Sequence, residues 1–167
     1  NFIFSLLKGS SEISESTDNI FMDNGMILNS DYFCVALLRL EQYCELESRT
    51  TAFVVINVFE EICNKEFRGY VIELSDTEFA CLVNLNDRTE KAQLLSVLGE
   101  ATTFLRHHYH MKITIGISTI QEGMQGIHTA YKEAELALKY SYLMGVNILI
   151  DYPEIANREF RYPHASE

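Results

Sequence analysis

The chain has 167 residues, 47% of them hydrophobic, and a formal net charge of −11 at pH 7. These values predict one globular domain with a real core and exclude a disordered chain. The acidic surface disfavours direct contact with nucleic-acid phosphates or an anionic membrane, and no apolar run approaches the roughly 20 residues of a membrane span. No signal peptide is visible at Asn1, so we expect the chain to be part of a longer protein.

Residues 1–31 are predicted to form a leader helix and a linker. Asn1–Lys8 is apolar enough for one or two helical turns that end at Gly9, too short to be stable alone. Ser10–Asn19 is rich in serine and acidic residues and predicts a loop. Ile20–Leu28 is ambiguous, with a turn at Asp23-Asn24-Gly25.

Short apolar runs, and apolar stripes with helical periodicity such as Leu94, Leu98 and Leu105, predict seven further segments in residues 32–152. They are a strand at Tyr32–Tyr43, a helix at Thr50–Phe67, a hairpin of two strands within Gly69–Asn84, a helix at Asp87–Tyr109, a strand at Lys112–Ile120, a helix at Met124–Met144 and a strand at Asn147–Tyr152. The order β-α-β-β-α-β-α-β predicts an α/β (α+β) fold with a mostly antiparallel, ferredoxin-like or nucleotide-cyclase-like sheet. Residues 153–167 are a mixed, polar tail.

Single residues predict several boundaries. Gly69 is a plausible terminator of the first long helix, and Asp87 is a good N-cap with Glu90 three residues later. Gly116, inside a strand, predicts a bulge or a close backbone contact. Pro153 is expected to stop the last strand.

Four polar side chains at strand ends and at the hairpin tip are candidates for chemistry: Arg39, Glu41, Asp76 and Glu78. Two or three carboxylates there could hold a divalent cation, but the positive charge of Arg39 opposes cation binding. We therefore predict no metal ligand, no cofactor and no catalytic residue. The sequence also contains no phosphate-binding glycine loop and no nucleophile elbow.

The four cysteines are Cys34, Cys44, Cys63 and Cys81. Without a C-x-x-C pair they predict reduced, buried thiols in a cytoplasmic protein rather than a zinc site or disulfides. Three histidines cluster near a helix C-terminus: His107, His108 and His110. Cationic or polar side chains are favoured at a helix C-terminus, and this explains the three histidines better than metal ligation. His128 and His164 have no evident partner. The tyrosines Tyr131, Tyr140 and Tyr142 suggest packing rather than base stacking.

The segment Ser75-Asp76-Thr77-Glu78-Phe79 resembles the hairpin motif of the GGDEF (diguanylate cyclase) family, in which Glu78 and Phe79 match. Gly116 in its strand, and Gly145 and Asn147 after the last helix, also match the family pattern. The resemblance covers about Tyr32 to Tyr152. It implies a degenerate GGDEF-like domain at residues 32–152, because Ser75, Asp76 and Thr77 replace the two glycines and the aspartate.

Other departures from the family pattern bear on activity. The family's metal-binding D-x-D falls at Arg39 and Glu41. Its nucleotide-binding pairs fall at Tyr43-Cys44 and Glu47-Ser48, and its product-inhibition motif falls at Phe67 and Tyr70. Phosphoryl transfer depends on metal and positive positioning groups, so the resemblance implies a domain without cyclase activity. The degenerate cleft would comprise Arg39, Glu41, Ser75, Asp76, Thr77 and Glu78.

The leader FIFSLLKG, the degenerate domain and the tail from Tyr162-Pro163 to Glu167 resemble the middle of long AraC-type bacterial transcriptional regulators. This resemblance implies a cytoplasmic signalling module between an upstream sensor, in some cases membrane-anchored, and a downstream helix-turn-helix domain that binds DNA. A homodimer is a possible assembly. Two alternatives stay open at this point: a divergent nucleotide cyclase using Glu41 and Glu78, and a small-molecule or nucleotide sensor that reuses the cyclase cleft.

Overall fold

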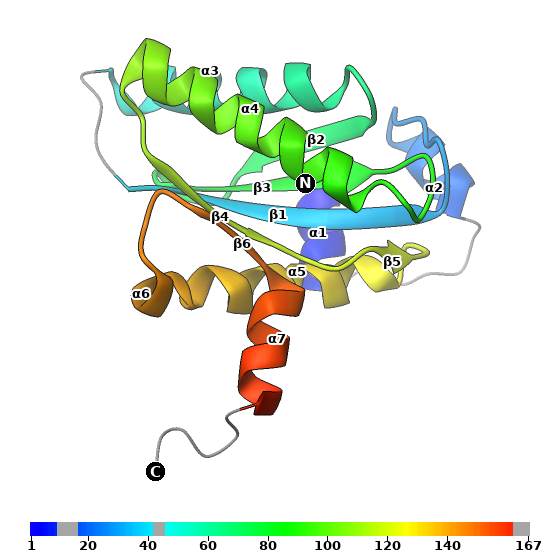
Figure 1. Ribbon diagram of the computed structural model, residues 1–167. Coiled ribbons are helices and arrows are strands. Elements are labelled where there is room, and N and C mark those ends of the chain that lie inside the picture. Colours follow the sequence, from blue (N-terminus) through cyan, green and yellow to red (C-terminus); the bar gives the residue numbers. More distant parts are fainter. Residues whose placement is uncertain (10–16, 42–45, 162–167) are drawn as a thin grey trace.

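The computed structural model describes residues 1–9, 17–41 and 46–161, with the side chains of 17, 18 and 158–161 left aside (Figure 1). The helices are α1 (Phe2–Lys8), α2 (Thr17–Asp23), α3 (Ser48–Cys63), α4 (Lys91–Tyr109), α5 (Gly126–Lys139), α6 (Ser141–Met144) and α7 (Tyr152–Arg161). The strands are β1 (Tyr32–Leu40), β2 (Arg68–Glu73), β3 (Glu78–Asn84), β4 (Ile113–Ile117), β5 (Gln121–Glu122) and β6 (Leu149–Asp151). The predicted order of strands and helices is confirmed, with β5, α2, α6 and α7 as additions.

The strands form one sheet in the order β2-β3-β1-β4-β6, and β5 pairs with β1. All pairs are antiparallel except β4 with β6, which confirms the mostly antiparallel sheet. The central strand is β1, which hydrogen-bonds to both β3 and β4. It is buried almost throughout, as expected of a strand covered on both faces.

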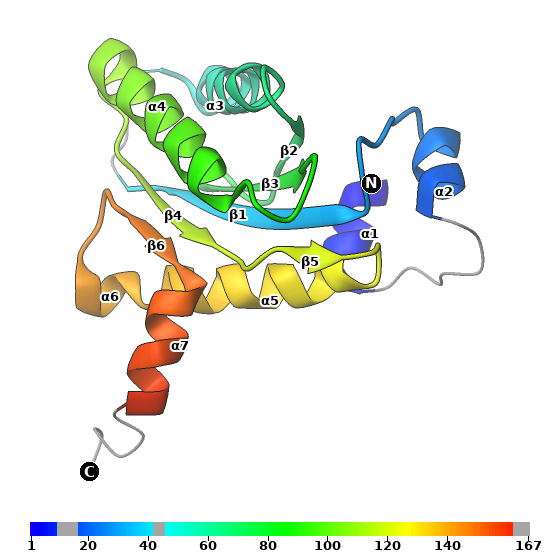
Figure 2. The same cartoon turned by 45° about the vertical axis from the view of Figure 1, so that its right-hand side comes forward.

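Helices cover the sheet on both faces, α3 and α4 on one side and α1 and α5 on the other (Figures 1 and 2). Alternation along the strands divides the apolar residues between two cores. In β1, Cys34, Ala36 and Leu38 face α3 and α4, whereas Phe33, Val35 and Leu37 face α1 and α5. The leader helix is therefore part of the domain's packing, because its Ile3, Leu6 and Leu7 are buried in the second core.

Two predicted helix ends were wrong for a local reason. The first long helix ends at Cys63, because the Asn64 side chain donates to the Glu60 carbonyl and accepts from the Gly69 amide at 2.9 Å. Gly69 itself lies in β2, where a Cβ atom would come within 2.7 Å of the Cβ of Cys63. The next helix begins after Glu90 rather than at Asp87, whose carboxylate accepts from the Thr89 amide in a turn that precedes the helix.

Further boundaries also differ from the prediction. Residues 17–19, expected in a loop, belong to α2, and the predicted helix at Met124–Met144 divides into α5 and α6 around Tyr140. The last strand ends at Asp151 rather than at Tyr152, and the tail contains the helix α7, in whose first turn Pro153 is tolerated. The predictions for Tyr43, Cys44, His164 and residues 162–167 lie outside the described residues. Within those described, no helix is long and apolar enough to cross a membrane.

Gly116 makes the close backbone contact that the sequence allowed. A Cβ atom at this position would lie 2.5 Å from the carbonyl oxygen of Ala134 and 2.6 Å from the amide nitrogen of Leu138. Main chain cannot move aside as a flexible side chain can, so the glycine lets α5 pack directly on β4. The buried face of α5 is rich in small residues, since Ala130, Ala134 and Ala137 are all buried.

Candidate functional site

The ends of β1 and β3 bring three of the predicted site residues together. Arg39 pairs in register with Glu78, so their side chains emerge beside each other on the same face of the sheet. That face is the one covered by α5, because Leu37 and Ala80, two residues further along each strand, belong to the core beneath this helix. Glu41 follows β1, where its amide donates to the Lys112 carbonyl at 2.8 Å.

The Arg39 guanidinium is held by three neighbours. It donates to the Glu41 carboxylate and to the Ser141 hydroxyl, and its central carbon lies 5.6 Å from the centre of the Tyr142 ring. The Arg39 and Glu41 side chains are only 18% and 16% exposed. The Arg39 guanidinium is therefore held in place at the end of β1, and the Glu41 carboxylate is paired with it.

Ser75, Asp76 and Thr77 form the turn between β2 and β3 instead of joining that cluster. The Ser75 hydroxyl accepts from the amides of Thr77 and Glu78, at 3.3 and 3.1 Å. The Thr77 carbonyl accepts from the Leu40 amide at 2.7 Å and ties the turn to β1. Asp76 is exposed and is not among the residues that line the neighbouring cleft.

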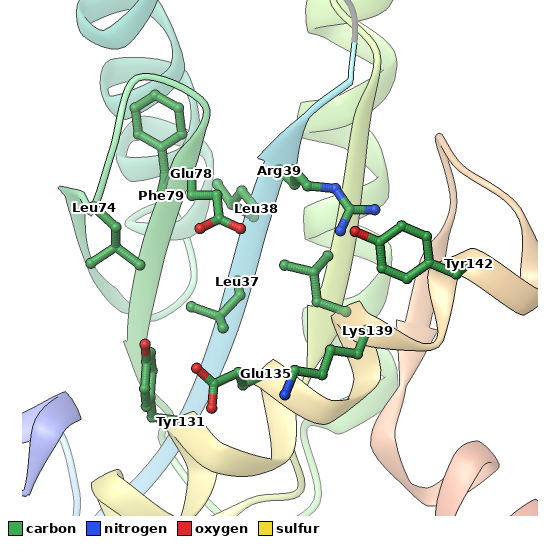
Figure 3. Close-up of a pocket in the computed structure, with 11 residues that line it drawn as sticks. Leu37, Leu38, Arg39, Leu74, Glu78, Phe79, Tyr131, Glu135, Lys139 and Tyr142 are labelled. Atoms are coloured by element: carbon green, nitrogen blue, oxygen red, sulfur yellow. The ribbon is translucent and has the colours of Figure 1, made fainter.

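A cleft of about 210 Å³ lies between this end of the sheet and α5 (Figure 3). Apolar lining comes from both sides, with Leu37 and Leu74 from the sheet side and Leu138 from α5. The polar lining residues are Arg39, Glu78, Tyr131, Glu135, Lys139 and Tyr142. Of these, Glu135 and Lys139 were missed as site residues, and Tyr131 and Tyr142 were assigned to packing. In the sequence, these residues could have been found by their spacing along one helix face. The sequence did not show which part of the protein that face would contact.

The leader helix reaches the edge of the same cleft. Lys8 donates to the Tyr131 hydroxyl at 2.8 Å, and this hydrogen bond raises the pKa of the Lys8 ammonium, with further contributions from the charges of Glu135 and Glu78. His128 has a partner after all, because its Nδ1 lies 2.7 Å from the Leu7 carbonyl oxygen. Two polar contacts therefore fix the C-terminal end of α1 on α5.

The thiols and the histidine cluster lie apart from the cleft. Cys34, Cys63 and Cys81 are buried, as predicted, and burial raises the pKa of the Cys34 thiol to about 11. His107 and His108 lie in the last turn of α4, and His110 caps it in a left-handed conformation. Across the described part of the chain, no group of three or more acidic, cysteine or histidine side chains is placed to hold a metal ion.

Comparisons with known proteins agree on the fold. Residues 25–140 match the GGDEF-like domain family. The active GGEEF domain of a diguanylate cyclase from Vibrio cholerae superposes with a TM-score of 0.58 at 13% identity, over 73% of this chain and 83% of that one. The coiled-coil and GGDEF domain of DgcB from Caulobacter crescentus gives a TM-score of 0.52 at 14% identity, over 80% and 75% of the two chains. No curated protein sequence matches the chain.

Proposed function

We propose that this chain, which belongs to the GGDEF-like domain family, is a non-catalytic regulatory domain that transmits a signal between its neighbours in a longer protein. The observation that carries the proposal is the position of α5, which contacts both terminal helices. On one side, Leu6 and Leu7 of α1 pack in the core that α5 covers. On the other, Ile155 of α7 is buried against Ala137 of α5 and Ile150 of β6.

This arrangement offers a physical route for a signal. A displacement of α1 by an upstream sensor would act on α5 through Lys8–Tyr131 and His128–Leu7. Movement of α5 would in turn change how α7 packs against it, and α7 leads toward the downstream part of the proposed longer protein. We infer that the parent protein is a cytoplasmic or membrane-anchored AraC-type regulator whose downstream helix-turn-helix domain binds DNA, and that dimerisation is one form the output takes.

The cluster around Arg39 supports the absence of catalysis. The family resemblance places the metal-binding acidic pair at Arg39 and Glu41, and here these two side chains bind each other. A held guanidinium repels a divalent cation, and phosphoryl transfer relies on such cations to neutralise developing charge. At the turn, Ser75 and Asp76 add side chains where the family's glycines let backbone approach phosphate groups.

Turnover is the direct test of the non-catalytic part. The purified chain is incubated with GTP or ATP in the presence of Mg²⁺ or Mn²⁺, beside the active Vibrio cholerae domain as a positive control, and products are separated by chromatography. We expect no product above the protein-free blank. Metal-dependent product that disappears in Glu78→Gln would instead establish the divergent cyclase alternative.

Transmission is tested in the parent protein. We expect its gene to encode a DNA-binding domain next to this segment, and a gene without one contradicts the proposal. In a transcription reporter, Lys8→Met removes the bond to Tyr131 and should change the response to the upstream signal. Lys65→Met is the matched control, because Lys65 is an exposed lysine that follows α3 and lies among residues of α3 and α4 rather than of α5.

A further inference from the structure

The outer edge of β2 is bound by side chains of the same chain. Among the described strands, β2 lies at one end of the sheet and pairs with β3 (Figure 1). Along an edge strand, every second residue directs its main-chain N–H and C=O groups away from the sheet. Such groups are a template for a strand of another chain when nothing occupies them. The side chains that bind them therefore decide whether a further strand can be added.

The register of the hairpin shows which residues of β2 face outward. The Leu74 amide donates to the Glu78 carbonyl at 2.8 Å, so Leu74 and the even-numbered residues before it direct their main-chain groups to β3. Gly69, Val71 and Glu73 therefore direct theirs to the outer edge. A further strand would pair with the main-chain groups of these three residues.

Two side chains at the C-terminal end of α3 bind the first two of these residues. The Glu60 carboxylate accepts from the Val71 amide at 3.0 Å. The Asn64 side chain binds Gly69 twice, because it accepts from its amide at 2.9 Å and donates to its carbonyl at 3.1 Å. A strand added to this edge would need the same main-chain groups. Binding of β2 by Glu60 and Asn64 therefore excludes pairing with a second chain.

The side chains of β2 suit pairing with a copy of the same strand. In an antiparallel pair of two β2 strands centred on Val71, Tyr70 of each copy lies opposite Ile72 of the other. Tyr70 and Ile72 are half-buried and lie on the face of the sheet that is away from α3. An aromatic side chain opposite a β-branched one stabilises an antiparallel pair. Two such pairs would form across one two-fold axis.

We propose that the outer edge of β2 is an interaction surface for a second copy of the chain, and that Glu60 and Asn64 hold this surface closed. While both side chains are bound to β2, the sheet cannot extend beyond this strand. A displacement of the C-terminal end of α3 would break the bonds to Val71 and Gly69 together and open the edge. This inference goes beyond the proposed function, because it concerns α3 and β2 rather than α5 and the helices at its two ends.

Glu60→Ala tests the closure by removing the acceptor of the Val71 amide. In analytical ultracentrifugation of the full chain, self-association should be at least about tenfold tighter than in the wild type. The mean mass should rise with concentration from 19.2 kDa toward twice that value. In dilute solution, hydrogen exchange of the Val71 amide should be at least about tenfold faster than in the wild type, because the amide loses a charge-assisted bond.

Two matched variants separate the hydrogen bond from the charge. Glu60→Gln retains an acceptor oxygen and should associate no more than the wild type. Glu61→Ala makes the same charge change at the next residue, which is exposed and lines a groove toward α4, and it should also leave association unchanged.

A proline in place of Glu73 identifies the surface that associates. Because the Glu73 amide faces outward, Glu73→Pro removes a donor from the edge and leaves the bonds of β2 to β3 in place. Added to Glu60→Ala, it should return association to the level of the wild type. Asn64→Ala opens the edge at Gly69 and should also increase association. Its control is Asn57→Ala, because the Asn57 side chain donates to the Phe53 carbonyl within α3.

The inference is overturned if folded Glu60→Ala and Asn64→Ala both associate no more than the wild type, or if Glu61→Ala associates as strongly as Glu60→Ala. It is also overturned if Glu73→Pro does not weaken the association of Glu60→Ala. Far-UV circular dichroism shows whether each variant is folded.

The wild type itself provides a readout if the variants do not fold. The amides of Gly69 and Val71 should be protected from hydrogen exchange, whereas the Glu73 amide should exchange quickly. Fast exchange at Gly69 and Val71 would overturn the inference. None of these measurements depends on nucleotide turnover or on the transcription reporter, so the inference and the proposed function fail separately.

Discussion

Leu7→Ala tests whether the leader helix belongs to the folded domain. Leu7 is fully buried, in the core shared by α1, α5 and the sheet. Truncation of a buried leucine costs about 2–5 kcal/mol through lost burial and the cavity left behind. In a protein of this size, each kcal/mol lowers the melting temperature by about 2–4 °C. A central loss of about 3 kcal/mol therefore predicts a decrease of about 6–12 °C.

Phe4→Ala is the control for this prediction. Phe4 lies on the same helix, but its side chain is 43% exposed, so its truncation should cost less than about 1 kcal/mol. Urea unfolding curves of the wild type and both variants, with midpoint and slope fitted together, give the free energies of unfolding. A loss below about 0.5 kcal/mol for Leu7→Ala would refute the docking of α1 and, with it, the route from α1 to α5.

Three further changes test the packing and the buried polar groups. Gly116→Ala should destabilise the domain by at least about 3 kcal/mol in the same assay, because its methyl would meet the main chain of Ala134 and Leu138. Asn84→Ala should cost about 2–5 kcal/mol, because the buried amide accepts from the amide of residue 29 at 2.6 Å and donates to the carbonyls of residues 30 and 32. Burial raises the pKa of the Cys34 thiol to about 11. The stabilisation from keeping this thiol protonated is therefore complete below about pH 9. As the pH rises to about 11, the free energy of unfolding should fall by ~3 kcal/mol. The difference between the urea midpoints at pH 8 and at pH 10.5 should therefore be smaller in Cys34→Ala than in the wild type.

The strand and helix order was predictable because it depends on local periodicity. Continuous apolar runs located β1 and β3, and the helical stripe of Leu94, Leu98 and Leu105 located α4, where these three residues are fully buried. Helix ends were less predictable, because they depend on which polar group reaches which main-chain atom. Asn64, for example, ends α3 through bonds to residues four before and five after it.

The site was predictable only where residues share a strand register. Arg39 and Glu78 were both predicted to belong to the site, and they pair in register across adjacent strands. Asp76 was expected with them, but a turn residue follows no strand alternation, and its side chain is exposed. Glu135 belongs to a helix more than 90 positions from Arg39 in the sequence, and no local pattern shows that α5 would close over this end of the sheet.

Under the regulatory function proposed above, Arg39 stands where the family resemblance implies a metal ligand, and this bears on what the fold can transmit. A bound metal ion can leave, so a site that depends on it responds to ligand and metal together. A guanidinium held by Glu41 and Ser141 is a permanent part of the chain, and it joins the end of β1 to the start of α6. Because α6 follows α5 directly, this link limits how far the C-terminal end of α5 can move from the sheet. The N-terminal end of α5, where α1 docks through Lys8 and Leu7, is then the end that can move. A signal from the leader helix would reach the cleft by tilting α5 about the end that Arg39 holds.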